Sequence, residues 1–257
     1  MSDWNPQQYL KFEKERTQPS IDLVAKISIE GPRTIIDIGC GPGNSTQILH
    51  QRWPLADIIG IDNSRTMIEK ARADYPHQQW EIRDAACVVP GQTYDIVFSS
   101  ATLQWVPDHD VLIPRLYEMV NDKGVLAVQI PANIESPFFK IMLKVGGNAR
   151  WGAYTKGCEK LLTYHPAEYY YNKLSSLTQD IDLWKTSYFH AMRSHKDLTA
   201  WHKSTGMRPF LEKLPDDKAR EEFENEIVDE CRAAYPVQSD GNILYIFERL
   251  FFIAGKK

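Results

Sequence analysis

The stretch that decides the fold is residues 34–44, which read TIIDIGCGPGN. Its first five residues form a short run rich in β-branched side chains, the pattern of a buried parallel strand. The three glycines that follow stand at alternate positions, where they let the backbone turn tightly and approach a ligand closely. A helix beginning at Asn44 would then offer free backbone N–H groups. The stretch therefore predicts a strand, a ligand-binding turn and a helix.

Strands and helices continue to alternate on both sides of this stretch. Ser64 and Asp108 are good helix N-caps, and residues 121–124 (NDKG) suit a turn. This alternation predicts right-handed crossovers and a parallel sheet. We expect further strands at residues 57–61, 79–82, 94–98 and 125–130, and helices at residues 9–26, 44–52, 64–74 and 108–120.

The pattern changes after Pro131. Residues 132–175 are rich in aromatic residues and glycine, and residues 196–234 have a helical pattern between two further strands at 182–190 and 243–254. The expected fold is an α/β Rossmann-like, doubly wound, mostly parallel seven-stranded sheet. We interpret residues 1–257 as one domain with an N-terminal helical segment at 1–30. The two insertions, 132–175 and 196–234, are predicted to form a helical lid that covers the active site.

The composition of the chain argues against several classes of function. The chain has 257 residues, 43 % of them hydrophobic and 25 % charged, and its net charge of -4 argues against a non-specific nucleic-acid binder. No apolar window is long enough for a membrane span, and the polar N-terminus does not have the pattern of a secretory signal. The four cysteines form no CxxC pair, so no metal site is expected. These features predict a cytoplasmic protein with reduced thiols. The oligomeric state stays open, and a monomer is compatible with the sequence.

Acidic residues end three successive strands. Asp37 precedes the glycines, and Asp62 stands about 20 residues after them, where a carboxylate can accept both ribose hydroxyls. Asp84, followed by Ala85, could bind the amino group of an adenine. Glycines alone could mean only a tightly packed turn, but the three acids at regular spacing favour a nucleoside cofactor.

The spacing of the glycines favours S-adenosylmethionine over NAD. A dinucleotide site reads GxGxxG, whereas no glycine stands at position 44 or 45 here. S-adenosylmethionine has no phosphate, so the loop N–H groups would meet its carboxylate and Asp37 its ammonium group. The candidate cofactor-binding residues are Asp37, Gly39, Cys40, Gly41, Asn44, Asp62, Asn63, Met67, Asp84, Ala85, Ser100 and Tyr9.

These motifs resemble the class I S-adenosylmethionine-dependent methyltransferase family. Residues 99–105 (SSATLQW) are similar to the loop after the fourth strand in its small-molecule members. Residues 3–6, 9–12, 103–109 (LQWVPDH) and 205–209 (TGMRP) resemble the branch that methylates small polycarboxylic acids such as trans-aconitate. The resemblance spans nearly the whole chain, and the last-named stretches are its most specific part.

One segment departs from the family. An acidic residue of the family is Ala132 here, and the pair Phe138 and Phe139 stands where the family has polar residues. These changes keep open a different oxygen, nitrogen or carbon acceptor. A cofactor-binding protein without turnover, and an NAD-dependent oxidoreductase, are the further alternatives.

The resemblance implies methyl transfer to a carboxylate oxygen, which gives a monomethyl ester. A carboxylate is already ionised at neutral pH, with an ordinary pKa of ~4, so no general base is required. No catalytic side chain is therefore expected, and the protein would act by proximity and orientation.

An anionic acceptor calls for arginine, whose planar fork binds a carboxylate through two hydrogen bonds. The aromatic face of Trp105 would suit a sulfonium. A surface arginine, a structural ion pair or a core tryptophan are the simpler interpretations of such residues. The candidate substrate-binding residues are Arg208, Arg16, Trp105, Gln104 and Arg249.

Overall fold

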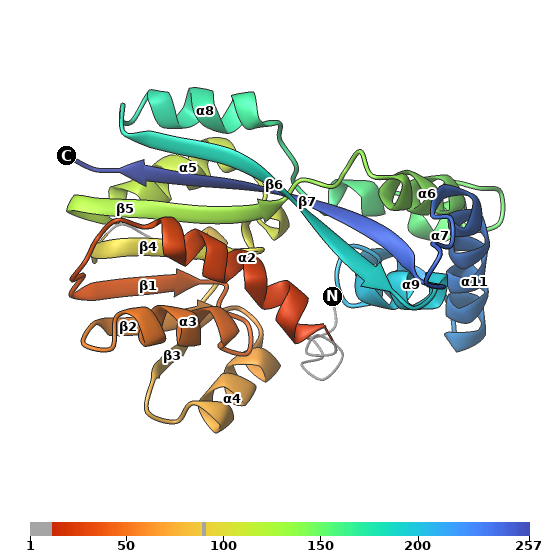
Figure 1. The fold of residues 1–257 in the computed structure, drawn as a ribbon, viewed down its shortest axis with the longest axis horizontal. Helices are drawn as coiled ribbons and strands as arrows, with labels where there is room; N and C mark the ends of the chain where they lie inside the picture. The colour runs from red at the N-terminus through yellow and green to blue at the C-terminus, as the bar shows by residue number, and fades with distance from the viewer. Residues whose placement is uncertain (1–11, 89–90) are drawn as a thin grey trace. The chain divides into compact units, whose positions relative to one another are not determined.

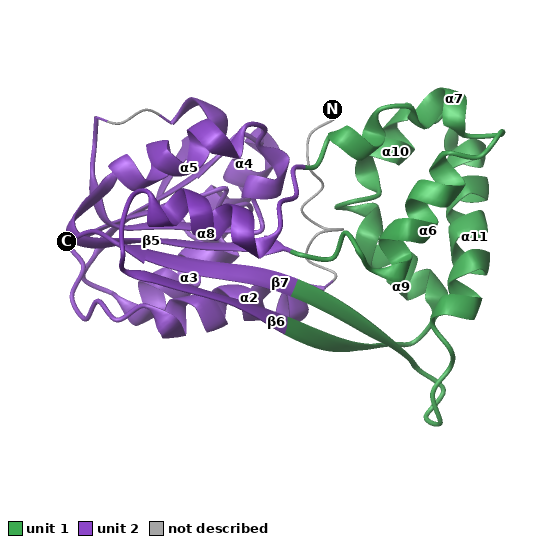
Figure 2. Cartoon of the chain, turned by 90° about the horizontal axis from the view of Figure 1, so that it is seen from above, with its two compact units in different colours: residues 1–2, 132–162, 187–248 green, residues 3–131, 163–186, 249–257 purple. Residues whose placement is uncertain are grey.

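The computed structural model describes residues 12–88 and 91–257, and the chain divides into two compact units (Figure 2). Of the described residues, unit 2 contains 12–88, 91–131, 163–186 and 249–257. Unit 1 contains residues 132–162 and 187–248. The insertion predicted at 132–175 is thus divided between the units at residue 162. Its role as a lid remains a prediction.

One seven-stranded sheet runs through the fold in the order β3-β2-β1-β4-β5-β7-β6 (Figure 1). Its neighbouring pairs from β3 to β5 are parallel, and β7 is antiparallel to β5. The predicted seven-stranded, mostly parallel sheet is confirmed. The strands are β1 Thr34–Ile38, β2 Asp57–Asp62, β3 Gln79–Ile82, β4 Tyr94–Ser100, β5 Val120–Pro131, β6 Ile181–Met192 and β7 Ile243–Gly255.

The order of the strands reverses between β1 and β4. From β1 the chain proceeds to β2 and β3 on one side, and it then returns to place β4 on the other side. In an open α/β sheet, the crevice beyond the carboxyl ends of two such strands is where ligands bind. The centre of the sheet is apolar, since the side chains of Ile36 and Val97 are fully buried.

Helices cover the sheet of unit 2. The side chains of Ser64 and Asp108 accept backbone N–H groups at the starts of α4 and α5, as their N-cap assignments predicted. The helical elements are α2 Glu13–Lys26, α3 Asn44–Arg52, α4 Arg65–Asp74, α5 His109–Glu118 and α8 Ala167–Ser175, with short 3₁₀ turns η1 Ala85–Cys87 and η2 Leu103–Trp105.

The predicted turn at residues 121–124 is wrong. These residues belong to β5, whose pairing with β4 changes register between Tyr94 and Ile96. Lys123 has a φ of 63°, and its N–H donates to the carbonyl of Lys256 at 2.8 Å. The NDKG sequence therefore forms an irregularity inside a strand, because residues near the C-terminus hydrogen-bond to it.

Unit 1 is a helical cluster with the remaining parts of β6 and β7. Its core includes Phe138, Phe223 and Ile227, all fully buried. The helical elements are α6 Pro137–Gly146, α7 Gly152–Thr155, η3 Cys158–Lys160, α9 His195–Lys203, α10 Arg208–Lys213 and α11 Asp217–Ala234.

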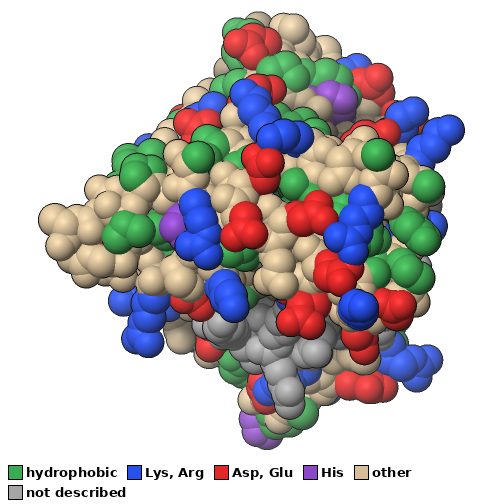
Figure 3. Space-filling model, turned by 90° about the vertical axis from the view of Figure 1, so that its right-hand side faces the viewer, with side chains coloured by type: hydrophobic (Ala, Val, Ile, Leu, Met, Phe, Trp, Pro, Cys, Tyr) green, Lys and Arg blue, Asp and Glu red, His purple; other side chains and the backbone are tan. Residues whose placement is uncertain are grey.

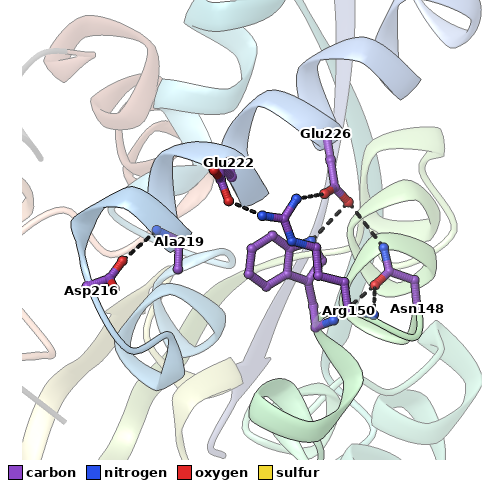
Figure 4. Close-up of polar contacts among 7 residues, drawn as sticks. Asn148, Arg150, Asp216, Ala219, Glu222 and Glu226 are labelled. Carbon is purple, nitrogen blue, oxygen red and sulfur yellow. Dashed lines mark hydrogen bonds and ion pairs between the residues drawn. The ribbon is translucent and has the colours of Figure 1, made fainter.

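Acidic side chains of α11 form ion pairs within unit 1 (Figure 4). Arg150 bridges Glu222 and Glu226, and Glu226 also accepts from Asn148 at 3.1 Å. Figure 3 shows Lys, Arg, Asp and Glu side chains interspersed on one face of the molecule. Mixed charge of this kind is typical of a solvated surface. Among the described residues, no helix is long and apolar enough to cross a membrane.

A buried hydrogen-bonded pair generates a stability prediction. His109 Nε2 lies 2.8 Å from the carbonyl oxygen of Leu103, and His109 Nδ1 lies 2.8 Å from the hydroxyl of Tyr170. Because a carbonyl only accepts, Nε2 carries the proton and Tyr170 donates to Nδ1. The variant Tyr170→Phe leaves this buried nitrogen without a donor. We expect urea denaturation to show a free energy of unfolding lower by about 1–3 kcal/mol.

The neighbouring Tyr171 supplies the matched control, since it is 53 % exposed. Tyr171→Phe should change the free energy of unfolding by less than about 0.5 kcal/mol. Equal effects of the two variants would contradict the role assigned to the Tyr170 hydroxyl.

Candidate active site

A pocket lies at the carboxyl ends of β1 and β4, where the strand order reverses. It encloses about 420 Å³, part of it open to solvent. The described residues that line it all belong to unit 2, and they come from α2, the glycine turn, the start of α3 and the end of β4. They are Glu13, Arg16, Thr17, Ser20, Gly39, Cys40, Gly41, Pro42, Asn44, Ser45, Ser100 and Ala101.

The glycine turn is fixed by the neighbouring strand. The N–H groups of Gly39 and Cys40 both donate to the carbonyl of Ile61, at 2.8 and 3.0 Å. Gly39 has a φ of 74°, and a Cβ atom placed on it would lie 2.1 Å from the side chain of Thr102. Position 39 therefore requires glycine, both for the backbone conformation and for the close approach of the loop after β4.

Asp62 links the turn to the start of α4. Its Oδ2 accepts the N–H of Gly41 at 3.0 Å, and its Oδ1 accepts the N–H of Ser64 at 2.8 Å. A carboxylate can accept several hydrogen bonds at once. The position at the end of β2 suits the predicted contact with a ribose.

Asp37 is fully buried beneath the turn. Its Oδ2 accepts from the hydroxyls of Ser45 at 2.6 Å and Thr46 at 2.7 Å. Its Oδ1 has no hydrogen-bond partner among the residues that the structure describes. Burial raises the pKa of Asp37 to about 6, against the lowering effect of the two hydroxyls. Asp37 does not line the pocket itself, but it holds Ser45, which does.

The predicted cofactor residues lie in two groups. Gly39, Cys40, Gly41, Asn44 and Ser100 line the pocket together. A second group stands at the ends of β2 and β3, outside the lining, and consists of Asn63, Met67, Asp84 and Ala85.

The members of the second group differ in exposure. Met67 and Ala85 are buried, whereas Asn63 and Asp84 are exposed. Asp84 accepts the N–H of Ala86 at 2.8 Å and so caps η1. Tyr9 lies outside the residues that the structure describes.

The predicted substrate residues are also divided. Arg16 is buried in the wall of the pocket, and Arg249 is buried in β7, where it donates to Gln129 at 3.2 Å. Gln104 donates to the carbonyl of Ala101 at 2.6 Å, and Trp105 follows it in η2. Arg208 belongs to unit 1 and forms an ion pair with Glu212 at 2.9 Å.

Six of the lining residues were missed by the sequence analysis. Three of them are close in sequence to predicted site residues, namely Pro42, Ser45 and Ala101. The other three, Glu13, Thr17 and Ser20, recur together with Arg16 at intervals of three and four residues, which is one face of α2. A polar stripe at helical spacing was therefore the signal. Its meaning depends on what the helix packs against, which the sequence of the helix does not contain.

The aromatic pair that departs from the family serves the packing of unit 1. Phe138 and Phe139 lie in the first turn of α6 and are buried. Phe138 stacks on the ring of His202, with the two centroids 3.9 Å apart. This part of the departure is therefore explained by the apolar core of unit 1.

Comparison with known proteins identifies the family. A family model described as a methyltransferase domain matches residues 9–185. A trans-aconitate 2-methyltransferase from Escherichia coli O139:H28 is 41 % identical over 256 residues, which cover 100 % of this chain and 99 % of that protein. This similarity favours a methyltransferase over the oxidoreductase alternative.

Solved structures with low sequence identity share the fold. A putative methyltransferase from Bacillus halodurans matches with a TM-score of 0.60 and 14 % identity, over 93 % of this chain and 99 % of that one. A phosphoethanolamine N-methyltransferase from Haemonchus contortus, solved with S-adenosylhomocysteine, matches with a TM-score of 0.56 and 15 % identity. That match covers 93 % of this chain and 53 % of the other.

The raised pKa of Asp37 predicts a pH dependence of stability. Its pKa is about 6 in the folded protein, against an ordinary value of 3.8. Between these values the folded chain binds more protons than the unfolded chain, so the free energy of unfolding falls as pH rises. The contribution is fully present below about pH 4 and is lost as pH passes 6, by up to about 3 kcal/mol. Asp37→Asn should remove it in denaturant titrations from pH 4 to 7.

The exposed Asp57 is the control for this experiment. The variant Asp57→Asn should keep the pH slope of the original protein. A slope in Asp37→Asn that matches the original protein would show that another group titrates.

Proposed function

Because this chain belongs to the trans-aconitate 2-methyltransferase family, we propose that it methylates a carboxylate of trans-aconitate with S-adenosylmethionine as the methyl donor. The products are a monomethyl ester and S-adenosylhomocysteine. The observation that carries the proposal is the similarity over the whole chain, joined to a pocket at the expected end of the sheet.

The acidic residues around the glycine turn fit the methyl donor. Asp37 has a carboxylate oxygen without a partner in the described part of the chain, and it stands below the turn that would face the ammonium group. Asp62 stands at the end of β2, where its carboxylate suits two ribose hydroxyls. We assign the adenine to the second group of cofactor residues, at Asp84 and Ala85 with Asn63 and Met67 beside them, and we keep Tyr9 as a candidate.

The chain's own residues would orient the two ligands rather than exchange protons with them. When bound, S-adenosylmethionine supplies a methyl group on a sulfonium, which the ionised carboxylate oxygen of the acceptor can attack directly. The arginines would fix the acceptor in line with the methyl group. Arg16 and Arg249 are the assigned contacts from unit 2, with Gln104 and Trp105 in η2. Arg208 of unit 1 remains a prediction.

We also propose a cytoplasmic location and action on a free metabolite, without a nucleic-acid or membrane partner. The four cysteines are free thiols, and Cys87 is exposed, which suits a reducing compartment. A monomer is compatible with the sequence.

The test is a methyl-transfer assay with S-adenosylmethionine and trans-aconitate, read by mass spectrometry. We expect a product heavier than the acid by one methylene group, and fragmentation locates the ester. If S-adenosylhomocysteine binds but no ester forms, the acceptor assignment fails. A panel of other acids, amines and phenols would then identify the acceptor. Ala132, where the family has an acidic residue, would be the first residue to examine.

Asp62 provides a direct test of the donor site. Asp62→Ala removes the acceptor for the ribose hydroxyls and for the N–H of Gly41. We expect calorimetry to show weaker binding of S-adenosylhomocysteine, by roughly 1–3 kcal/mol. Asp74→Ala, which removes a carboxylate of α4 paired with Lys70, should leave the affinity unchanged. An unchanged affinity in both variants would remove Asp62 from the site.

A further inference from the structure

A row of hydrogen-bonded polar side chains runs from the pocket wall into the sheet of unit 2. The hydroxyl of Ser20 donates to that of Ser100 at 2.9 Å, and Ser100 donates to Gln129 Oε1 at 3.1 Å. Nη1 of Arg249 donates to the same oxygen at 3.2 Å. Ser20 and Ser100 both line the pocket.

The register of the sheet places these groups on one face. Ser100 of β4 lies opposite Gln129 of β5, and Gln129 lies opposite Phe251 of β7. Arg249 is two residues from Phe251, so its side chain leaves the sheet on the same side. Helix α2, which carries Ser20, packs against β5. Three strands and one helix therefore converge on the Gln129 side chain.

Arg249 fixes the orientation of the Gln129 amide. A guanidinium has donors and no acceptor, so the amide oxygen must be the atom that faces it. The amide nitrogen, Nε2, then points elsewhere. Gln129 is 0 % exposed, and its Nε2 has no hydrogen-bond partner among the residues that the structure describes. A buried donor left without an acceptor is costly, so it calls for an explanation.

Charge around this amide favours an anion. Arg16 stands one helical turn before Ser20 in the pocket wall, and Arg249 approaches the amide from β7. Both guanidinium side chains are buried. Glu13, the acidic lining residue, accepts a hydrogen bond from Asn44 at 2.6 Å, near the glycine turn.

The acidic and basic side chains of this region thus stand in different places. Asp37 and Asp62 lie around the glycine turn, whereas Arg249 contacts Gln129 and Arg16 lines the pocket wall. A ligand with a cationic end and an anionic end matches this polarity.

We propose that Gln129 is the specificity-determining residue of a carboxylate subsite, which it forms with Arg16, Ser20, Ser100 and Arg249. Its Nε2 donates to a carboxylate oxygen, and the two guanidinium groups balance the negative charge. The inference rests on the proposed function for the identity of the ligands. The carboxylate belongs either to the acceptor acid or to the amino-acid end of the methyl donor, and both present the same chemistry to the subsite.

The variant Gln129→Glu tests the subsite with almost no change in size. It replaces the Nε2 donor with an oxygen and adds a negative charge beside Arg249, so a carboxylate should be repelled. Calorimetry would measure binding of S-adenosylhomocysteine, of adenosine, and of trans-aconitate to protein saturated with S-adenosylhomocysteine. We expect one carboxylate ligand to bind about tenfold more weakly or worse, while adenosine, which has no carboxylate, is unaffected.

The binding measurements with S-adenosylhomocysteine and with trans-aconitate identify the source of the carboxylate. If S-adenosylhomocysteine binds more weakly while the affinity for adenosine is unchanged, the subsite belongs to the methyl donor. If trans-aconitate binds more weakly while the affinity for S-adenosylhomocysteine is unchanged, the subsite belongs to the acceptor. The proposed subsite is overturned if the Gln129→Glu variant binds every ligand with the affinity of the original protein. It is also overturned if the affinity for adenosine falls as much as the affinity for S-adenosylhomocysteine.

Two further variants show whether the effect of Gln129→Glu comes from misfolding or from an added charge anywhere on the protein. Ser20→Asp introduces a negative charge from α2 and leaves the residues of the sheet unchanged, and it should weaken binding of the same ligand. Gln92→Glu adds the same charge at an exposed position and should change nothing. Failure of the original protein to form any ester refutes the proposed acceptor. The subsite is judged separately, by binding in the Gln129→Glu and Ser20→Asp variants.

Discussion

The site depends on one carbonyl group, that of Ile61 at the end of β2. It accepts the N–H groups of both Gly39 and Cys40, and the next residue, Asp62, accepts the N–H of Gly41. The first turn of the sheet is therefore built on the end of the neighbouring strand. This arrangement requires the parallel register in which Ile38 lies opposite Ile61. It also requires glycine at position 39, because the turn and the Thr102 side chain are in close contact there. The start of α3, the buried Asp37 and the pocket wall all take their positions from this turn.

The loop after β4 forms the other side of the turn. Ala101 has a φ of 55°, which is unusual for a residue other than glycine, and such strain persists only where neighbours fix the backbone. The N–H of Ala101 donates to the carbonyl of Gln129, and its carbonyl accepts from the Gln104 side chain. His109 and Tyr170 hold the same loop from outside. A strained and heavily hydrogen-bonded wall suits a reaction that depends on the position of two ligands more than on proton transfer.

The distribution of charge in the pocket matches the proposed chemistry. Asp37 and Asp62 lie around the glycine turn, whereas Arg249 of β7 contacts Gln129 of β5 and Arg16 of α2 lines the pocket. Methyl transfer from a sulfonium to a carboxylate removes one positive and one negative charge, so tight pairing of the two ligands would stabilise the ground state more than the transition state. Separate anchors for the cationic and anionic ends of the ligands let the protein hold them in line without relying on that attraction.

The sequence determined the features that a few consecutive residues specify. The strand, the glycine turn and the helix at residues 34–44, the N-caps at Ser64 and Asp108, and the family were all predicted correctly, since each is a property of a local pattern. The tertiary structure decided what depends on distant partners. Residues 121–124 join a strand because Lys256 hydrogen-bonds to them, and Ser20 belongs to the pocket because α2 packs on β5. Gln129 acquires its unpaired donor only when β4, β5 and β7 align. Backbone propensity acts over a few residues, whereas these contacts join segments that are 29 to 120 positions apart in the case of Gln129, which only the folded chain brings together.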